Sequence, residues 1–253
     1  MANLSRLEDI VASLRGENGC PWDKKQTPFT LKQYLLEEVY ELIEAIEEEN
    51  IEAIKEELGD VLFILVFIAH IYKEKNIFNL EEIVQYVAEK MIRRHPHVFG
   101  QEKAKDIETI RTRWEEIKNK EKKKKSILNG IPKTLPALSL AYKIGERASK
   151  VGFDWKNVED VFEKMIEETE EFKKAIKEND TEKIKEELGD ILFTWVNIAR
   201  LLKISPEEAL RGTIKKFKER FYFIENELKR KGKSLNNASL YEMDHLWEQA
   251  KRK

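Results

Sequence analysis

The sequence predicts an all-α protein made of two tandem copies of one helical unit of the four-helix-bundle type. Apolar residues recur at the i, i+3/i+4, i+7 spacing of core-facing helices along nearly all of its 253 residues. Ten glycines and six prolines are too few for the many turns of a β-sandwich or barrel. A long segment of the first half also recurs in the second half. Together these observations predict the fold class.

The clearest helix is YLLEEVYELIEAI, residues 34–46, whose apolar stripe we expect to face the core. The members of this stripe are Leu35, Leu36, Val39, Leu42, Ile43 and Ile46. Further helices are predicted over residues 4–15, 51–74, 79–94, 106–122, 136–149, 158–178, 181–203, 206–231 and 239–251. Breaks are expected where glycine and proline gather, at 16–28, 95–96, 129–136 and 231–237.

Two domains are expected, residues 1–118 and 137–253. The segment 119–136 between them combines a charge run with glycine and proline, which is typical of a linker. Four consecutive lysines within it, 122–125, resemble a nucleic-acid-binding patch, but we interpret them as part of a solvated linker.

The internal repeat is the strongest organisational feature of the sequence. A shift of 130 places Glu37–Phe63 on Glu167–Phe193 without a gap, and EELGD recurs unchanged. A shift of 133 relates two W-x-x-x-K motifs, and a shift of 126 relates two K-x-x-x-R motifs. Two copies of one helical unit explain the length of the chain.

Composition excludes several classes of protein. The single cysteine, Cys20, rules out a disulfide framework and a cysteine-based zinc site within one chain. A net charge of −2 provides no general attraction to nucleic acid. The longest apolar run, residues 61–69, is about half a membrane span, and the first residues lack the apolar core of a signal peptide. We therefore expect a cytoplasmic protein without membrane or specific nucleic-acid partners.

Each copy carries the acidic pattern E-E-x-x-E followed by E-x-x-D. Glu38 and Glu41 lie one turn apart on one helix, and Glu57 and Asp60 lie one turn apart on the next. A tight hairpin around Asn50 would make these helices antiparallel neighbours and gather the four carboxylates. Such a cluster repels itself unless it is protonated or bridged by a cation. Oxygen ligands without His or Cys suit Mg²⁺, or Mn²⁺.

The alternative for these acids is a solvated helix surface, as in many Glu-rich proteins. Against it, Glu57 shares a helical stripe with Val61, Ile64 and Ile68, so the sequence places it towards the core. Gly59 lies in the helix interior, where glycine costs about 1 kcal/mol relative to alanine. A glycine there indicates that something approaches the backbone closely. Both observations favour the metal site.

Several motifs resemble the MazG family of nucleoside triphosphate pyrophosphohydrolases, in the all-α NTP-pyrophosphatase superfamily. In the first half these are GCPWDKKQT (19–27), YLLEEVYELIEAI, EELGDVLF and IRRHPHVFG (92–100). In the second half they are VGFDW (151–155), EETEE, EELGDILF, KKFKERF (215–221) and MDHLWEQAK (243–251). TPFTL (27–31) departs from the family, which commonly has a histidine near the proline, so the resemblance assigns no role to that loop.

The resemblance implies hydrolysis of NTPs or dNTPs to the monophosphate and pyrophosphate, in nucleotide-pool housekeeping. It implies Mg²⁺ ligands at Glu38, Glu41, Glu57 and Asp60, and in the second copy at Glu168, Glu171, Glu187 and Asp190. Glu37 and Glu167 would orient or deprotonate the attacking water. In each copy a Lys–Arg pair would clamp the phosphates and a tryptophan would stack on the base, with a further lysine at the phosphates or the base edge. These substrate-binding residues would be Lys216, Arg220, Trp247 and Lys251 in the second copy, and Lys90, Arg94, Trp114 and Lys118 in the first. Trp155 and Trp195 are interpreted as core residues.

Two other functions stay open. One is a narrower pyrophosphohydrolase of the same superfamily, acting on dCTP or phosphoribosyl-ATP; the other is a non-catalytic helical repeat that binds nucleotide or metal. A ferritin-like di-iron bundle is disfavoured because it needs Glu-x-x-His motifs on two helices, and only one histidine, His245, lies three residues after a glutamate. Apolar faces such as residues 61–69 predict a homodimer. The second copy is expected to carry most of the hydrolysis, because Arg94 ends its helix at His95-Pro96.

Overall fold

The computed structural model describes residues 4–100, 106–121 and 126–252, and within these ranges all the regular structure is helical. The chain divides into two compact units, Met1–Lys122 and Lys123–Lys253. The last helix of the first unit runs to Glu121 and so enters the expected linker. The four-lysine run lies outside the described residues. Among those described, no helix has an apolar stretch long enough to cross a lipid bilayer.

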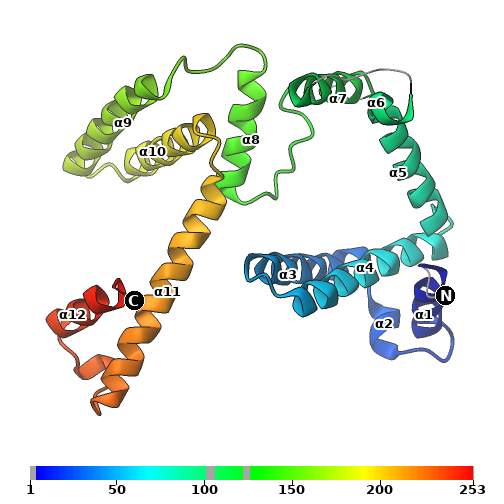
Figure 1. The fold of residues 1–253 in the computed structure, drawn as a ribbon, viewed down its shortest axis with the longest axis horizontal. Helices are drawn as coiled ribbons and strands as arrows, with labels where there is room; N and C mark the ends of the chain where they lie inside the picture. Colours follow the sequence, from blue (N-terminus) through cyan, green and yellow to red (C-terminus); the bar gives the residue numbers. More distant parts are fainter. Residues whose placement is uncertain (1–3, 101–105, 122–125, 253) are drawn as a thin grey trace. The chain divides into compact units, whose positions relative to one another are not determined.

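The first unit is organised around a hairpin of two long helices (Figure 1). Its helices are α1 (Leu4–Arg15), α2 (Pro21–Lys25), α3 (Pro28–Glu47), α4 (Ile51–Glu74), α5 (Leu80–Arg94), α6 (Pro96–Phe99) and α7 (Ile107–Glu121). Helices α3 and α4 form the hairpin, and α1 packs against α4. Helix α2 lies within the break expected at 16–28, and α6 starts at the break expected at 95–96 and continues to Phe99. Each starts with a proline, which is tolerated there because the N–H at the first position of a helix has no hydrogen-bond partner within the helix.

Local hydrogen bonds set the ends of the hairpin helices. Thr27 and Thr30 form a reciprocal capping box, so α3 starts at Pro28, ahead of the apolar segment 34–46. Glu49 takes a left-handed conformation, with φ of 54°, in the turn after α3. Asn50 then caps α4, its side-chain oxygen accepting from the N–H of Ala53 at 3.2 Å. The hairpin expected around Asn50 is therefore present.

The core of the first unit lies where α1, α3 and α4 meet. Val11, Leu31, Phe67 and Ile71 are among its buried members. The expectation that the whole 34–46 stripe faces the core is wrong. Leu35 is partly buried against it, whereas Leu36, Ile43 and Ile46 are exposed. The apolar face of this helix is wider than the area that one neighbouring helix can cover.

The second unit repeats the hairpin. Its elements are α8 (Ala137–Ser149), α9 (Val158–Glu178), α10 (Thr181–Leu201), α11 (Pro206–Arg230), the 3₁₀ helix η1 (Leu235–Asn237) and α12 (Leu240–Ala250). Helices α9 and α10 form the hairpin, with Asn179 left-handed at the turn and Asp180 capping α10. Helix α8 packs on α10, and α12 packs on α11.

Two small cores stabilise the second unit. Val161, Met165 and Ile198 join α9 to α10. Ile224, Leu228 and Leu246 join α11 to α12, with Trp247 packed against them. The interpretation of Trp155 and Trp195 as core residues is wrong, since their exposed fractions are 39% and 51%. Trp195 contacts the ring of Phe162 edge-on, and both side chains are exposed.

Candidate functional site

The hairpin of the first unit brings three acidic side chains together. Glu38 and Glu41 on α3 and Glu57 on α4 each offer a carboxylate oxygen, and these oxygens all lie within 4.8 Å of one another. The i, i+3 spacing places the first two on one face of α3, and the antiparallel turn sets that face against α4. Asp60 is exposed, but it lies close enough to raise the pKa of both Glu38 and Glu57 by repulsion.

The second unit forms the same cluster from the repeated residues. Glu168 and Glu171 on α9 and Glu187 on α10 have carboxylate oxygens within 4.8 Å of one another. Glu168 is buried, Glu187 is half-buried and Glu171 is exposed. Asp190 is exposed on α10 and contributes repulsion that raises the pKa of Glu187.

Electrostatics makes both clusters receptive to a cation. Partial burial is the main cause that raises the pKa of Glu38 above its usual value, followed by repulsion from Glu41, Asp60 and Glu57. Burial followed by repulsion likewise raises the pKa of Glu57 and of Glu187. A divalent cation would remove the repulsion, and oxygen-only donor sets of this kind fit Mg²⁺ or Mn²⁺.

A lysine in the second cluster was missed by the sequence reasoning. The Nζ of Lys164 lies 2.8 Å from an oxygen of Glu167 and 2.9 Å from an oxygen of Glu168. These two carboxylates hold the pKa of Lys164 well above its usual range. The repeat-related residue is Tyr34, so the first unit carries no lysine at this position. The i, i+3 and i, i+4 spacing of a lysine before the acidic motif was the signal available.

The two candidate water-activating residues lie beside the clusters. Glu37 and Glu167 are both exposed and belong to neither group of three oxygens. Glu167 is paired with Lys164, while Glu37 accepts a hydrogen bond from the amide nitrogen of Gln33 at 3.3 Å.

The helix-interior glycines face open space. A Cβ added at Gly59 or Gly189 would meet no atom within 4 Å. The described part of the chain therefore does not supply the close neighbour that the sequence suggested for Gly59.

The arginine and tryptophan of each expected clamp meet in the same way in both units. The guanidinium carbon of Arg94 lies 5.4 Å from the ring centre of Trp114, and that of Arg220 lies 5.5 Å from Trp247. Such contacts are cation–π interactions. The two arginines are 126 positions apart in the sequence and the two tryptophans 133 positions apart, whereas the acidic motifs repeat at 130. The matching contact is therefore not a simple consequence of the 130-residue repeat.

The lysines of the two clamps differ in their contacts. In the first unit, Lys118 lies over Trp114, 4.4 Å from the ring centre, and Lys90 lies 5.4 Å from the ring of Tyr86. In the second unit, Lys251 is ion-paired with Glu248, and Lys216 is exposed on α11.

Within each unit the clamp and the carboxylates occupy different places. In the second unit α12, which carries Trp247, lies beside the far end of α11 and away from the α9–α10 hairpin (Figure 1). In the first unit α7, which carries Trp114, is likewise separated from the α3–α4 hairpin. Each unit thus forms both a three-acid cluster and an Arg–Trp pair, but within one unit the Arg–Trp pair lies away from the acids.

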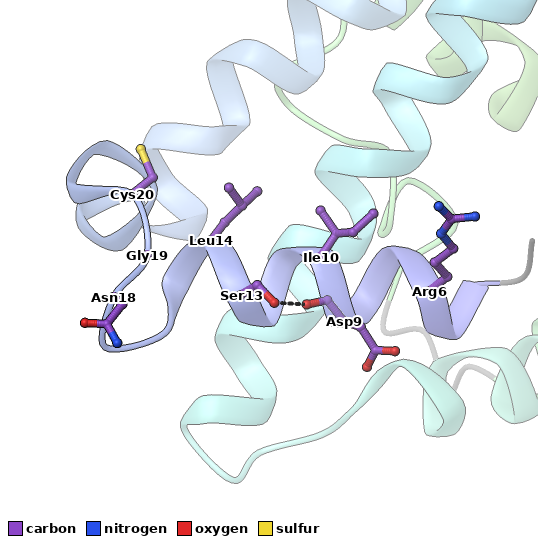
Figure 2. Close-up of a pocket in the computed structure, with 8 residues that line it drawn as sticks. All are labelled: Arg6, Asp9, Ile10, Ser13, Leu14, Asn18, Gly19 and Cys20. Atoms are coloured by element: carbon purple, nitrogen blue, oxygen red, sulfur yellow. Dashed lines mark hydrogen bonds between the residues drawn. The ribbon is translucent and has the colours of Figure 1, made fainter.

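One open hollow lies elsewhere, along α1 and the turn that follows it. Figure 2 shows Arg6, Asp9, Ser13 and Cys20 around it, and the hydroxyl of Ser13 donates to the backbone carbonyl of Asp9 at 2.8 Å. None of the expected site residues lines this hollow.

Comparisons with known proteins agree with the repeat. The MazG nucleotide pyrophosphohydrolase domain matches residues 26–99 and 156–221, which contain all eight candidate metal ligands. A Thermotoga maritima protein named nucleoside triphosphate pyrophosphohydrolase/pyrophosphatase MazG is 47% identical over 247 residues, 97% of this chain and 94% of that protein. An Escherichia coli nucleoside triphosphate pyrophosphohydrolase is 40% identical over 258 residues, 100% of this chain and 98% of that protein. The uncharacterised Bacillus subtilis protein YabN is 49% identical over 250 residues, 98% of this chain and 51% of that protein.

Proposed function

The chain belongs to the MazG nucleotide pyrophosphohydrolase family, and on that premise we propose that it hydrolyses NTPs and dNTPs to the monophosphate and pyrophosphate with Mg²⁺. The observation that carries the proposal is the group of three carboxylates in each unit, with oxygens within 4.8 Å of one another. Mn²⁺ is the alternative ion for the same donors. The activity would maintain the nucleotide pool in the cytoplasm.

The metal ligands we propose in the second unit are Glu168, Glu171, Glu187 and Asp190. Those in the first unit are Glu38, Glu41, Glu57 and Asp60. Support comes from the mutual repulsion of these acids and from the absence of His or Cys in the two clusters of the described chain. When bound, the ion neutralises phosphate charge and favours attack of water at the α-phosphorus.

The protein's own groups would activate the water and hold the substrate. Glu167, and Glu37 in the first unit, would orient or deprotonate the water, and the pair with Lys164 fixes the position of Glu167. The substrate clamps are Lys216, Arg220, Trp247 and Lys251, and their counterparts Lys90, Arg94, Trp114 and Lys118. Arginine suits this role because its guanidinium binds phosphate oxygens in bidentate fashion.

A homodimer would bring clamp and carboxylates together. Repeat-related positions on the two hairpins expose apolar side chains, which are costly in water and typical of interfaces. These pairs are Leu36 and Ile166, Leu58 and Leu188, and Leu62 and Leu192. Pairing of hairpins from two copies would bury these faces in four-helix bundles. The clamp lies away from the carboxylates within its own unit, so we propose that the partner copy supplies it.

Activity and metal dependence can be tested together. The full-length protein with Mg²⁺ should release pyrophosphate and the monophosphate from a panel of NTPs and dNTPs, separated by chromatography. Glu57→Gln combined with Glu187→Gln should lower the rate at least ~100-fold, because each unit loses a ligand. The matched control is Glu47→Gln with Glu163→Gln, two exposed carboxylates outside both clusters.

The outcomes separate the alternatives. Full activity in excess EDTA would contradict metal dependence, and release of diphosphate with orthophosphate would contradict attack at the α-phosphorus. Turnover of dCTP or phosphoribosyl-ATP alone would indicate the narrower enzyme. Nucleotide binding without turnover would indicate the non-catalytic binding protein.

The dimer is tested by mass and by complementation. Light scattering should give twice the 29.9 kDa chain mass, and Leu62→Lys with Leu192→Lys should give the monomer. Tyr241→Lys, at an exposed position on α12, is the control. Arg220→Ala and Glu187→Gln proteins should each lose most of the activity, and mixing them should restore part of it. A monomeric wild-type protein, or a mixture that stays inactive, would contradict the shared site.

A further inference from the structure

Arg94 is the clamp residue with the most distinctive surroundings. It is the last residue of α5, it is buried, and its guanidinium lies over the ring of Trp114. Its Nε and Nη2 donate to one carboxylate oxygen of Glu121 on α7, at 3.0 and 2.5 Å. The Nε of Arg93 lies 3.4 Å from the other oxygen of Glu121. A single carboxylate thus engages both arginines at the end of α5.

The contact uses the part of Arg94 that binds phosphate best. Nε and Nη2 form one edge of the guanidinium, which pairs with two oxygens of a carboxylate or phosphate in a fork. Glu121 lies against that edge, and Trp114 covers one face of the group. The Arg94 guanidinium lowers the pKa of Glu121, so the carboxylate stays ionised at neutral pH and neutralises the arginine. A phosphate group would have to displace it.

The second unit keeps the Arg–Trp pair without this carboxylate. Arg220 lies over Trp247 at 5.5 Å, and within the described residues no carboxylate lies at ion-pair distance from it. Glu248 is its acidic neighbour, but that carboxylate is ion-paired with Lys251. In the second unit no described carboxylate therefore holds the guanidinium edge of Arg220 as Glu121 holds that of Arg94.

We infer that Glu121 sets the affinity of the first unit for triphosphates. It occupies the phosphate-binding edge of Arg94, and the clamp of the first unit therefore binds triphosphates more weakly than the clamp of the second unit. This inference rests on the proposed function, because it takes the two Arg–Trp pairs as phosphate clamps. It would make two units with equal carboxylate sets bind triphosphates differently, through a competing internal anion and not through the metal ligands.

The test is calorimetric titration of the full-length protein with ATP and Mg²⁺ in the presence of a catalytically inactivating Glu37→Gln and Glu167→Gln pair. With Glu121 present we expect one strong ATP-binding event per chain, at the second unit, and one weaker event at the first unit. Glu121→Gln should strengthen the weaker event at least ~10-fold, since the neutral amide competes poorly with phosphate for a guanidinium. The amide keeps the shape of the side chain and can still accept a hydrogen bond from Arg94. The matched control is Glu116→Gln, an exposed carboxylate of α7 that pairs with Arg113.

Two further variants assign the gained event to the inferred contact. Arg94→Ala added to Glu121→Gln should abolish the gain, and Arg220→Ala should weaken the strong event and leave the gain intact. Thermal melts of each variant check that α7 stays in place. ATP binding that is the same with Glu121→Gln and with Glu116→Gln would overturn this inference alone. Absence of ATP binding in all these proteins would overturn the proposed function as well.

Discussion

Removal of acidic pairs from one unit at a time measures how the two units share the activity. Glu168→Ala with Glu171→Ala strips the α9 side of the second cluster, and Glu38→Ala with Glu41→Ala strips the α3 side of the first. The two perturbations are matched because they change repeat-related residues. We expect both variants to stay folded, since removing repelling carboxylates from an empty cluster relieves electrostatic strain.

The expected magnitudes follow from the clamps. A hydrogen bond to a charged group contributes about 1.5–3 kcal/mol, or about 10- to 150-fold in affinity. The second unit has this interaction available at Arg220, whereas in the first unit Glu121 already holds the corresponding edge of Arg94. The first unit should therefore provide at most about a tenth of the turnover. The α9 double variant should lose about 90% of the activity, and the α3 double variant less than half.

The assay is steady-state release of pyrophosphate at saturating Mg²⁺ and at an ATP concentration below KM, where differences in binding appear in the rate. Circular dichroism and thermal melts verify that each variant is folded. Equal losses in the two double variants would show equivalent sites. A larger loss from the α3 pair would reverse the assignment of the dominant unit.

Three further predictions concern stability. Gly189→Ala should stabilise the metal-free, dilute protein by about 1 kcal/mol, since the new methyl group meets no atom within 4 Å. A lower Tm would instead show that another surface packs against Gly189. The folded-state pKa of Glu38 is raised, mainly by burial, so its ionisation destabilises the metal-free fold as pH rises through that pKa. Glu38→Gln should therefore match wild-type Tm near pH 4 and exceed it by pH 7, and excess Mg²⁺ should reverse the order; a constant difference would refute the titration. Gly145→Ala would place a Cβ 2.9 Å from the Nε of Arg200, forcing that side chain off Asp154, and should cost about 1–3 kcal/mol in urea unfolding.

Local sequence was sufficient for the helices and for the acidic pairs. The start of α4 at Ile51 and the end of α9 at Glu178 agree with the periodicity because caps and turns act within a few residues. The fold class and the hairpin around Asn50 could be predicted for the same reason. The short helices α2 and α6 could not, since neither is long enough to show a period.

The surroundings of the polar side chains needed more than local pattern. Lys164 was overlooked although its spacing to Glu168 was visible, because exposed lysines at this spacing are common on helices and contribute little. Glu121 could not have been assigned to Arg94 from the sequence, since the two residues are on different helices and 27 positions apart.

The sequence by itself determined the helices, the duplicated unit and the paired acids, all of which depend on interactions between residues close in the chain or on the repeat itself. Tertiary structure decided which apolar residues are covered, leaving Leu36 exposed while Leu31 is buried. It also decided which charges meet, giving Arg94 a carboxylate that Arg220 lacks among the described residues. The physical reason is that burial and ion pairing depend on the approach of separate helices, and amphipathic periodicity specifies that a helix has an apolar face without specifying what covers it.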